Sequence, residues 1–529
     1  MKERYYPVGI QTFHEIINGG YVYVDKTDLM WKMQNKRKFI FLCRPRRFGK
    51  SLLSSTLHSF FAGEKSLFMG QKVMELEKDW NCYPVIHLDL STAKNQPSPD
   101  ALRTRLLLIL DEYAELYGRK DAEVTPGSLI EGIIRRARKM SGKQVVVIID
   151  EYDAPLLDAL YREDILDEMR QVMQEFYIPL KANEQHIKFC FITGVTKFSQ
   201  LSIFSTINNL TNISMWPEFS AICGITEQEL STAMHEDIEQ MAICNGMSYE
   251  EMHSKLKAQY DGYRFSEHSE EIYNPFSLLN AFDSKIIGTY WFDSGTPTFL
   301  LHQMQHYGTN IMNLERMKVP AIAFDKPTEA MTSALPLLYQ CGYLTIKDYD
   351  PETQEYVLAL PNQEVRTGYT EGLLPLYTGL SAPDVQTGFA ARFWKALKSG
   401  DIDLAMRHMQ AYLTSIPYVE GFKKKLAEAS AKEGFYEYTL YLIFSMLNVY
   451  VQTQVKCARG RADMVIWMAD AIYVFEMKVS ETAEEALAQI EEREYAIPFQ
   501  TDSRRVVKVG VKFNPDTRAP ESWIHETIH

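Results

Sequence analysis

The chain has 529 residues, 46% of them hydrophobic, and a formal net charge of −13. This length predicts about three or four domains, and the excess of acidic residues excludes a protein whose whole surface attracts polyanions. The sequence has no apolar run of bilayer-spanning length, its first residues lack a signal-peptide core, and its seven scattered cysteines form no CxxC pair. We therefore expect a cytoplasmic protein that acts away from membranes.

A strand–loop–helix pattern lies near the N-terminus, between Lys38 and Ser51. An apolar run precedes a loop that ends in Gly49-Lys50-Ser51, and apolar residues at helical spacing follow. Backbone N–H groups at such a helix start bind phosphate, so we expect ATP there, with Lys50 at the β- and γ-phosphates and the Ser51 hydroxyl on Mg²⁺. The residues expected to bind the nucleotide are Arg46, Arg47, Phe48, Gly49, Lys50 and Ser51.

The first position of this loop departs from the usual pattern, because Arg44 stands where glycine is expected. Together with Arg46 and Arg47 it makes the loop unusually basic. The alternative is that Gly-Lys-Ser occurs here by chance, with the arginines in solvent. The flanking strand and helix favour the phosphate-binding interpretation.

A second apolar strand, 144–149, ends in Asp150 and Glu151. Its five consecutive β-branched residues predict a strand buried on both faces of a parallel sheet. We expect Asp150 to hold Mg²⁺ through water and Glu151 to polarise the attacking water, which favours a hydrolase over a protein that only binds nucleotide.

Other residues are candidates for contact with the phosphates. Thr193 or Thr196, at the end of the apolar strand 186–195, would sense the γ-phosphate, and a turn without function is the alternative. Arg264 lies in a polar, largely helical stretch that we interpret as a lid presenting this arginine to the nucleotide. A surface salt bridge is the alternative for Arg264.

Several motifs of the first half together resemble the AAA-ATPase-like family of bacterial proteins, whose own phosphate loop begins with arginine. They are YVDKT at 23–27, RPRRFGKS at 44–51, IIDEYD at 148–153, ITGVTKFS at 192–199 and YDGYRF at 260–265. The resemblance implies an ATP-binding P-loop core. In the middle of the chain, a helix entering a strand at 337–346 and a second strand at 357–362 suggest a winged-helix-like module, which we interpret as a linker rather than a DNA reader.

The last third carries a second group of charged residues within apolar strands. A hairpin with its turn at Ala469-Asp470 places Asp463 opposite Glu476, and Lys478 lies two residues beyond on the same face. Two facing carboxylates are unfavourable unless a cation neutralises them, so we expect them to hold Mg²⁺ for phosphodiester hydrolysis, with Lys478 positioning the water. An exposed hairpin with a cross-strand salt bridge is the alternative.

This arrangement resembles the PD-(D/E)xK nuclease superfamily, whose pattern is matched by Asp463 and by Glu476-Met477-Lys478. The resemblance implies a further acid from a preceding helix and a site residue at Gln489. Glu433 and Glu437, four residues apart on one helix face, are the candidates for the acid, and we prefer Glu433. The sequence has Ala462 before Asp463 where the superfamily has proline. Inactive members of such domains exist, so a nucleotide-driven switch that binds nucleic acid or protein without cutting it remains the rival interpretation.

The predicted fold class is α/β, with four regions. They are a P-loop ATPase core (1–220), a helical lid (221–285), a winged-helix-like linker (286–380) and a small restriction-endonuclease-like α/β domain (381–529). We expect ATP and Mg²⁺ as cofactors and nucleic acid as partner, with DNA favoured over RNA, and the chain is compatible with a homo-oligomer.

Overall fold

The computed structural model describes most of the chain, and its described residues form two compact units, one ending at Glu364 and one beginning at Val365. The described residues are 4–157, 159, 162–196, 209–291, 317–325, 331–369, 383–414, 450–457, 460–468, 470–514, 517 and 519–528. None of the described helices combines the length and apolar character that a bilayer-spanning helix needs.

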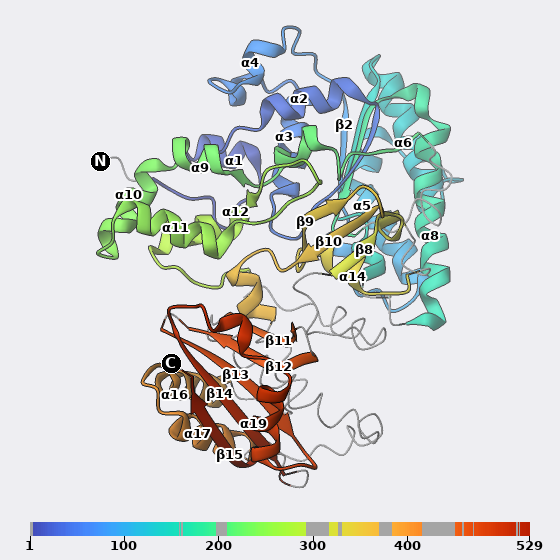
Figure 1. Ribbon diagram of the computed structural model, residues 1–529. Helices are drawn as coiled ribbons and strands as arrows, with labels where there is room; N and C mark the ends of the chain where they lie inside the picture. Colours follow the sequence, from blue (N-terminus) through green and yellow to red (C-terminus); the bar gives the residue numbers. More distant parts are fainter. Residues whose placement is uncertain are drawn as a thin grey trace. The chain divides into compact units, whose positions relative to one another are not determined.

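A five-stranded parallel sheet forms the centre of the first unit (Figure 1). Every residue of its strands β1 and β3 is buried, as the continuous β-branched and aromatic runs in the sequence predict. This confirms the predicted α/β class with a P-loop-like core. In spatial order the strands are β2 (Val85–Asp89), β3 (Val145–Asp150), β4 (Ile187–Gly194), β1 (Phe39–Cys43) and β5 (Thr211–Asn212).

Helices with clear sequence signals surround this sheet. Ser98 caps α5, while Thr125 and Ser128 form a capping box that starts α6. Figure 1 shows α5, α6 and α8 packed side by side, and α3 packs on β2, β3 and β4. The long helices are α2 (Thr27–Lys36), α3 (Lys50–Phe61), α5 (Pro99–Tyr117), α6 (Pro126–Ser141) and α8 (Glu163–Ala182). The short ones are α1 (Phe13–Asn18), α4 (Val73–Leu76), α7 (Ala154–Leu157), η1 (Lys65–Phe68), η2 (Leu90–Ala93), η3 (Glu184–His186) and η4 (Pro217–Ile222).

The stretch after the sheet is helical, as its sequence predicts. Capping boxes at Thr226–Glu229 and Ser248–Glu251 start two of its helices. A buried apolar cluster that includes Leu230, Ile238 and Leu256 holds the helices together. The elements of this region, the predicted lid, are β6 (Ile225–Thr226), α9 (Glu227–Ala233), α10 (His235–Cys244), α11 (Tyr249–Tyr260), β7 (Ile272–Tyr273) and α12 (Pro275–Ser284).

A three-stranded antiparallel sheet with one helix completes the first unit. Its order is β8-β10-β9, and β9 and β10 are the hairpin that the sequence predicts. The residues directly after β10 pack closely on the YDGYRF segment, since a Cβ added at Gly262 would lie 2.2 Å from the carbonyl oxygen of Pro361. The elements are β8 (Met317–Pro320), η7 (Ala321–Asp325), α14 (Leu335–Gln340), β9 (Thr345–Asp350) and β10 (Glu355–Ala359).

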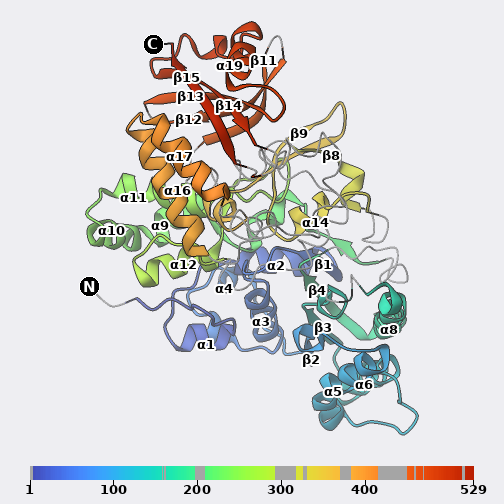
Figure 2. The same cartoon turned by 90° about the horizontal axis from the view of Figure 1, so that it is seen from below.

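The second unit is a mixed five-stranded sheet with helices. Only β13 and β14 pair in parallel among its neighbouring strands, and α19 makes the crossover that a parallel pair requires. Gly510 lets α19 approach β14, since a Cβ there would lie 2.3 Å from the carbonyl oxygen of Ala483. Figure 2 shows α16 and α17 running side by side. The elements are α16 (Pro383–Lys398), α17 (Ile402–Thr414), β11 (Tyr450–Cys457), β12 (Gly460–Trp467), β13 (Ala471–Lys478), α19 (Ala483–Glu492), η10 (Ile497–Phe499), β14 (Arg505–Phe513) and β15 (Pro520–Thr527).

Candidate functional sites

The loop between β1 and α3 has the backbone that the Gly-Lys-Ser motif predicts. Gly49 adopts φ 90°, a left-handed conformation that favours glycine, and Lys50 begins α3. The side chain of Lys50 is buried, and its Nζ donates a hydrogen bond of 3.0 Å to the carbonyl oxygen of Pro45. The ammonium therefore lies across the loop, where an incoming phosphate would compete with the Pro45 carbonyl for it.

Arg44 is buried rather than in solvent, with 1% of its surface exposed. Its guanidinium donates to the carbonyl oxygens of Cys43, Ser214 and Phe219 at 2.8–2.9 Å and lies 4.2 Å from the ring centre of Phe265. Burial lowers the pKa of Arg44. The sequence analysis counted Arg44 only among the loop's basic residues and missed its role in holding these backbone segments together. An arginine at a position where glycine is expected was the available signal for that role.

The structure brings Ser51, Lys50 and Asp150 together. Asp150, at the end of β3, is 3% exposed and hydrogen-bonds with the Ser51 side chain. Burial raises the pKa of Asp150 to about 6, although the Ser51 hydrogen bond and the Lys50 charge oppose the rise. A carboxylate and a hydroxyl in contact beside a buried lysine supply the oxygen ligands that Mg²⁺ prefers, so these residues fit the expected metal.

Glu151 follows Asp150 in a left-handed conformation, φ 51°, that is uncommon outside glycine. Its Oε2 is buried without a hydrogen bond among the described residues, and the Lys94 ammonium forms an ion pair with it at 3.9 Å. Asp153, to which sequence reasoning gave no role, is fully buried and accepts hydrogen bonds from the backbone of Val195 and Thr196 and from the Thr196 hydroxyl. It thereby ties the Asp150-Glu151 turn to the end of β4.

The sequence predicts that Thr193 and Arg264 lie near phosphate. In the structure both side chains have protein partners. The Thr193 hydroxyl donates to the carbonyl oxygen of Leu42 at 2.7 Å. The Arg264 guanidinium donates to the carbonyl oxygen of Lys347 at 3.2 Å and lies 3.9 Å from the Glu271 carboxylate, the kind of ion pair given as the alternative. Contact of either residue with nucleotide stays a prediction.

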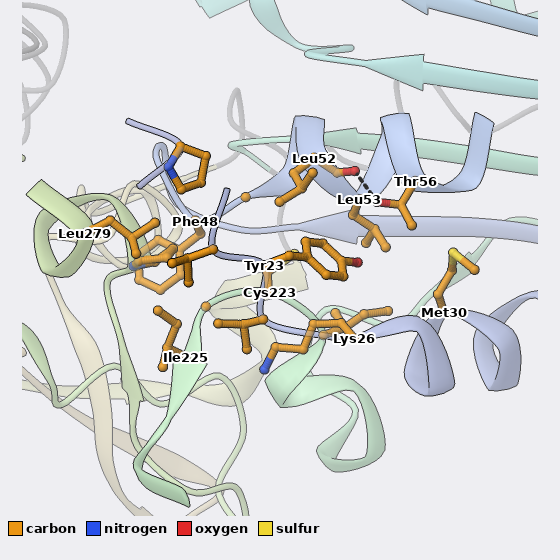
Figure 3. Close-up of a pocket in the computed structure, with 17 residues that line it drawn as sticks. Tyr23, Lys26, Met30, Phe48, Leu52, Leu53, Thr56, Cys223, Ile225 and Leu279 are labelled. Atoms are coloured by element: carbon orange, nitrogen blue, oxygen red, sulfur yellow. Dashed lines mark hydrogen bonds between the residues drawn. The ribbon is translucent and has the colours of Figure 1, made fainter. Parts of the chain in front are cut away.

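A mostly apolar pocket of about 90 Å³ opens beside Gly49 (Figure 3). The N-terminal segment, α3 and the lid all contribute to it, and among its polar side chains Lys26 donates to both oxygens of the Glu229 carboxylate. The sequence motif YVDKT supplies Tyr23 and Lys26, but only the fold places them at the loop. The lining residues are Pro7, Val22, Tyr23, Val24, Lys26, Met30, Phe48, Gly49, Leu52, Leu53, Thr56, Ile222, Cys223, Gly224, Ile225, Pro275 and Leu279.

In the second unit, β12 and β13 pair in the register that the predicted turn requires. Met464 lies opposite Phe475 and Val465 opposite Val474. Asp463 and Glu476 then meet: the Asp463 N–H lies 3.4 Å from Oε2 of Glu476, and Asp463 Oδ2 accepts from the Met477 N–H at 2.8 Å. The two carboxylates thus share one end of the hairpin.

Glu476 is 2% exposed, and burial together with the nearby Asp463 charge raises its pKa well above the ordinary value. The Lys478 ammonium lies 3.6 Å from Glu476 Oε1 and 3.5 Å from Glu481. Gln489 of α19 donates a hydrogen bond to Glu476 and lies 3.4 Å from the Tyr495 hydroxyl. The structure therefore brings Asp463, Glu476 and Lys478 to one place.

Tyr495 is the site neighbour that sequence reasoning missed. Its ring occupies the space where Gly460 lacks a side chain, since a Cβ there would lie 2.8 Å from the Tyr495 hydroxyl. Glu433, the expected helical acid, lies outside the described residues. Within the described residues no three His, Cys, Asp or Glu side chains gather as metal ligands. Asp463 and Glu476 supply two carboxylates, the type of ligand that a hard divalent cation prefers.

Comparison with known proteins relates the two ends of the chain to two families. Residues 7–204 match the family described as predicted AAA-ATPase, and residues 431–523 match the PD-(D/E)XK nuclease superfamily. The chain belongs to a family of predicted AAA-ATPases that carry a C-terminal domain of this nuclease superfamily. It is similar, at 32% identity over 543 positions that cover all of both chains, to an uncharacterized protein encoded in the vnfD 5' region of Azotobacter chroococcum mcd 1.

Proposed function

We propose that the protein binds and hydrolyses ATP with its first unit and that its second unit is a Mg²⁺-dependent nuclease acting on nucleic acid, with DNA favoured over RNA. The observation that carries the ATPase part is the contact of Ser51 with Asp150 beside the buried Lys50. The same proposal assigns ATP binding to residues 1–220, the lid to 221–285, a linker to 286–380 and nucleic-acid chemistry to 381–529.

The apolar pocket beside Gly49 suits the base of ATP. Lys26 is already paired with Glu229, and the Thr56 hydroxyl donates to the carbonyl oxygen of Leu52, so these side chains are committed to protein partners. Guanine has more donors on its edge than adenine, and leaving them unpaired in an apolar pocket costs free energy. This difference favours adenine.

For hydrolysis, we assign distinct tasks to two residues of the loop and to two acidic residues at the end of β3. Lys50 would leave the Pro45 carbonyl and bind the terminal phosphates, while Ser51 and Asp150 would hold Mg²⁺, which supplies positive charge against the developing phosphate charge. Glu151, with one oxygen lacking a hydrogen bond among the described residues, would orient and polarise the attacking water.

For phosphodiester cleavage, Asp463 and Glu476 would hold the metal. Burial and the nearby Asp463 charge raise the pKa of Glu476, and a bound cation would offset both effects, so metal binding and loss of the Glu476 proton would be linked. Gln489 fixes the orientation of the Glu476 carboxylate, and Lys478 would position the water or offset phosphate charge. Glu433 is our candidate for a further acid.

One observation supports the rival interpretation, a nucleotide-driven switch that binds nucleic acid or protein without cutting it. The described residues give the second site only two carboxylates. The deciding experiment incubates the full chain with single- and double-stranded DNA and RNA, Mg²⁺ or Mn²⁺, with and without ATP. We expect metal-dependent cleavage that Asp463→Ala and Glu476→Ala each reduce by about 100-fold or more. Absence of cleavage by the wild type under all these conditions would establish the switch.

A further inference from the structure

Arg47 of the phosphate loop lies against the first turn of the lid helix α12. Its guanidinium carbon is 4.5 Å from the ring centre of Phe276, within the range of a cation–π contact. Arg47 is exposed and Phe276 half-buried, and among the described residues the Arg47 guanidinium has no hydrogen bond or ion pair. The ring of Phe276 is therefore the contact that orients this side chain.

Both residues border the nucleotide pocket. Arg47 precedes Gly49 by two residues and has φ 67°. Pro275 and Leu279, which flank Phe276 on α12, line the pocket together with Gly49. The Arg47–Phe276 contact thus joins the phosphate loop to the lid at the edge of the pocket.

Stacking and phosphate binding use different parts of a guanidinium. The ring contacts the flat face, whereas phosphate oxygens accept hydrogen bonds from N–H groups that lie in the guanidinium plane. A stacked arginine therefore keeps its N–H donors available. The ring also restricts the side chain to fewer rotamers before the ligand binds, so less conformational entropy is lost on binding.

We propose that Phe276 is a positioning residue that holds Arg47 ready for the phosphates of the nucleotide, so that nucleotide phosphates and the lid helix α12 stabilise each other. This inference rests on the proposed function, because it requires that the loop binds ATP. It adds to that function a residue outside the loop motif and a physical link between ligand and lid.

The test measures the affinity of the full chain for ATP with Mg²⁺ and for adenosine by calorimetric titration and competition. Phe276→Leu keeps apolar volume and loses the ring, so we expect ATP binding to weaken about threefold to tenfold while adenosine binding is unchanged. Phe276→Tyr should bind ATP like the wild type. Arg47→Ala should weaken ATP binding, and adding Phe276→Leu to it should cause no further loss.

Asp283→Asn, an exposed change on the same helix, is the matched control and should leave ATP affinity unchanged. Circular dichroism and thermal unfolding confirm that each variant is folded. Unchanged ATP affinity in Phe276→Leu, or additive effects of the two substitutions, would overturn the inference while leaving ATP binding intact. Equal losses for ATP and adenosine would show a packing role instead. A wild type that binds no ATP would refute the proposed function itself.

Discussion

Arg44 shows how much one side chain contributes to the phosphate loop. Its guanidinium donates to the carbonyl oxygen of the adjacent Cys43 and to those of Ser214 and Phe219, which belong to a segment about 170 residues further along the chain. We expect Arg44→Met to destabilise the first unit by about 3 kcal/mol, because it leaves buried acceptors without donors. Denaturant unfolding measures the change.

Two variants complete this test. Arg44→Lys should not restore stability, because an ammonium cannot serve the separated carbonyl groups and stack on Phe265 at the same time. Arg37→Met, the same substitution at an exposed arginine, should change stability by less than about 0.5 kcal/mol. Equal small effects at positions 37 and 44 would contradict the bracing role.

At the scale of elements, strands were predictable, whereas contacts between distant segments were not. The β-branched run of β3 predicts its burial, and the apolar runs on either side of the predicted turn predict the register of β12 and β13. The burial and the register are both confirmed. The Asp463–Glu476 meeting follows from that register alone. The pocket, the burial of Arg44 and the position of Tyr495 depend on packing between segments far apart in sequence, which no local pattern encodes.

In the predicted lid, Glu227, the first residue of α9, connects segments that are far apart in the sequence. Its carboxylate accepts hydrogen bonds from His253 and Lys257 of α11 and from the Tyr273 hydroxyl of β7, at 2.6–3.1 Å. Burial alone would raise its pKa, but the three hydrogen bonds outweigh burial and bring the pKa to about 2. Glu227 therefore joins three elements of the lid through its charged form.

The sign of the resulting pH dependence follows from this lowered pKa. The stabilisation by Glu227 is full above its ordinary pKa, near 4.5, and is lost as the pH falls toward about 2. We expect Glu227→Gln to lower the thermal midpoint at about pH 6 and to differ less from the wild type at about pH 3. A difference that stays constant across this range would contradict the charge-based role.

At the scale of the whole molecule, the two candidate sites belong to different compact units, so each should be separable by mutation. Lys50→Ala should abolish ATP hydrolysis. Lys478→Ala should reduce nucleic-acid cleavage about 100-fold or more and leave ATP hydrolysis within about twofold of the wild type. Phosphate release and a gel-based cleavage assay measure the two activities on the same preparations.

Lys32→Ala, at an exposed position of α2, is the control for loss of a lysine and should affect neither activity. Chelation of divalent cations should stop both activities, because the proposed function assigns a bound cation to the carboxylates of each site. Loss of ATP hydrolysis in Lys478→Ala would show that the two sites do not act independently. We expect ATP hydrolysis to persist in Lys478→Ala, since Asp150 and Glu476 lie in separate units.

The arginine that opens the phosphate loop also bears on how related proteins are found and engineered. Motif searches that demand glycine at this position would discard such chains. A consensus redesign that installs glycine at position 44 would remove the donors that Ser214 and Phe219 rely on, and so would weaken the protein it was meant to improve. In this chain the arginine at position 44 is paired with a downstream aromatic residue, Phe265.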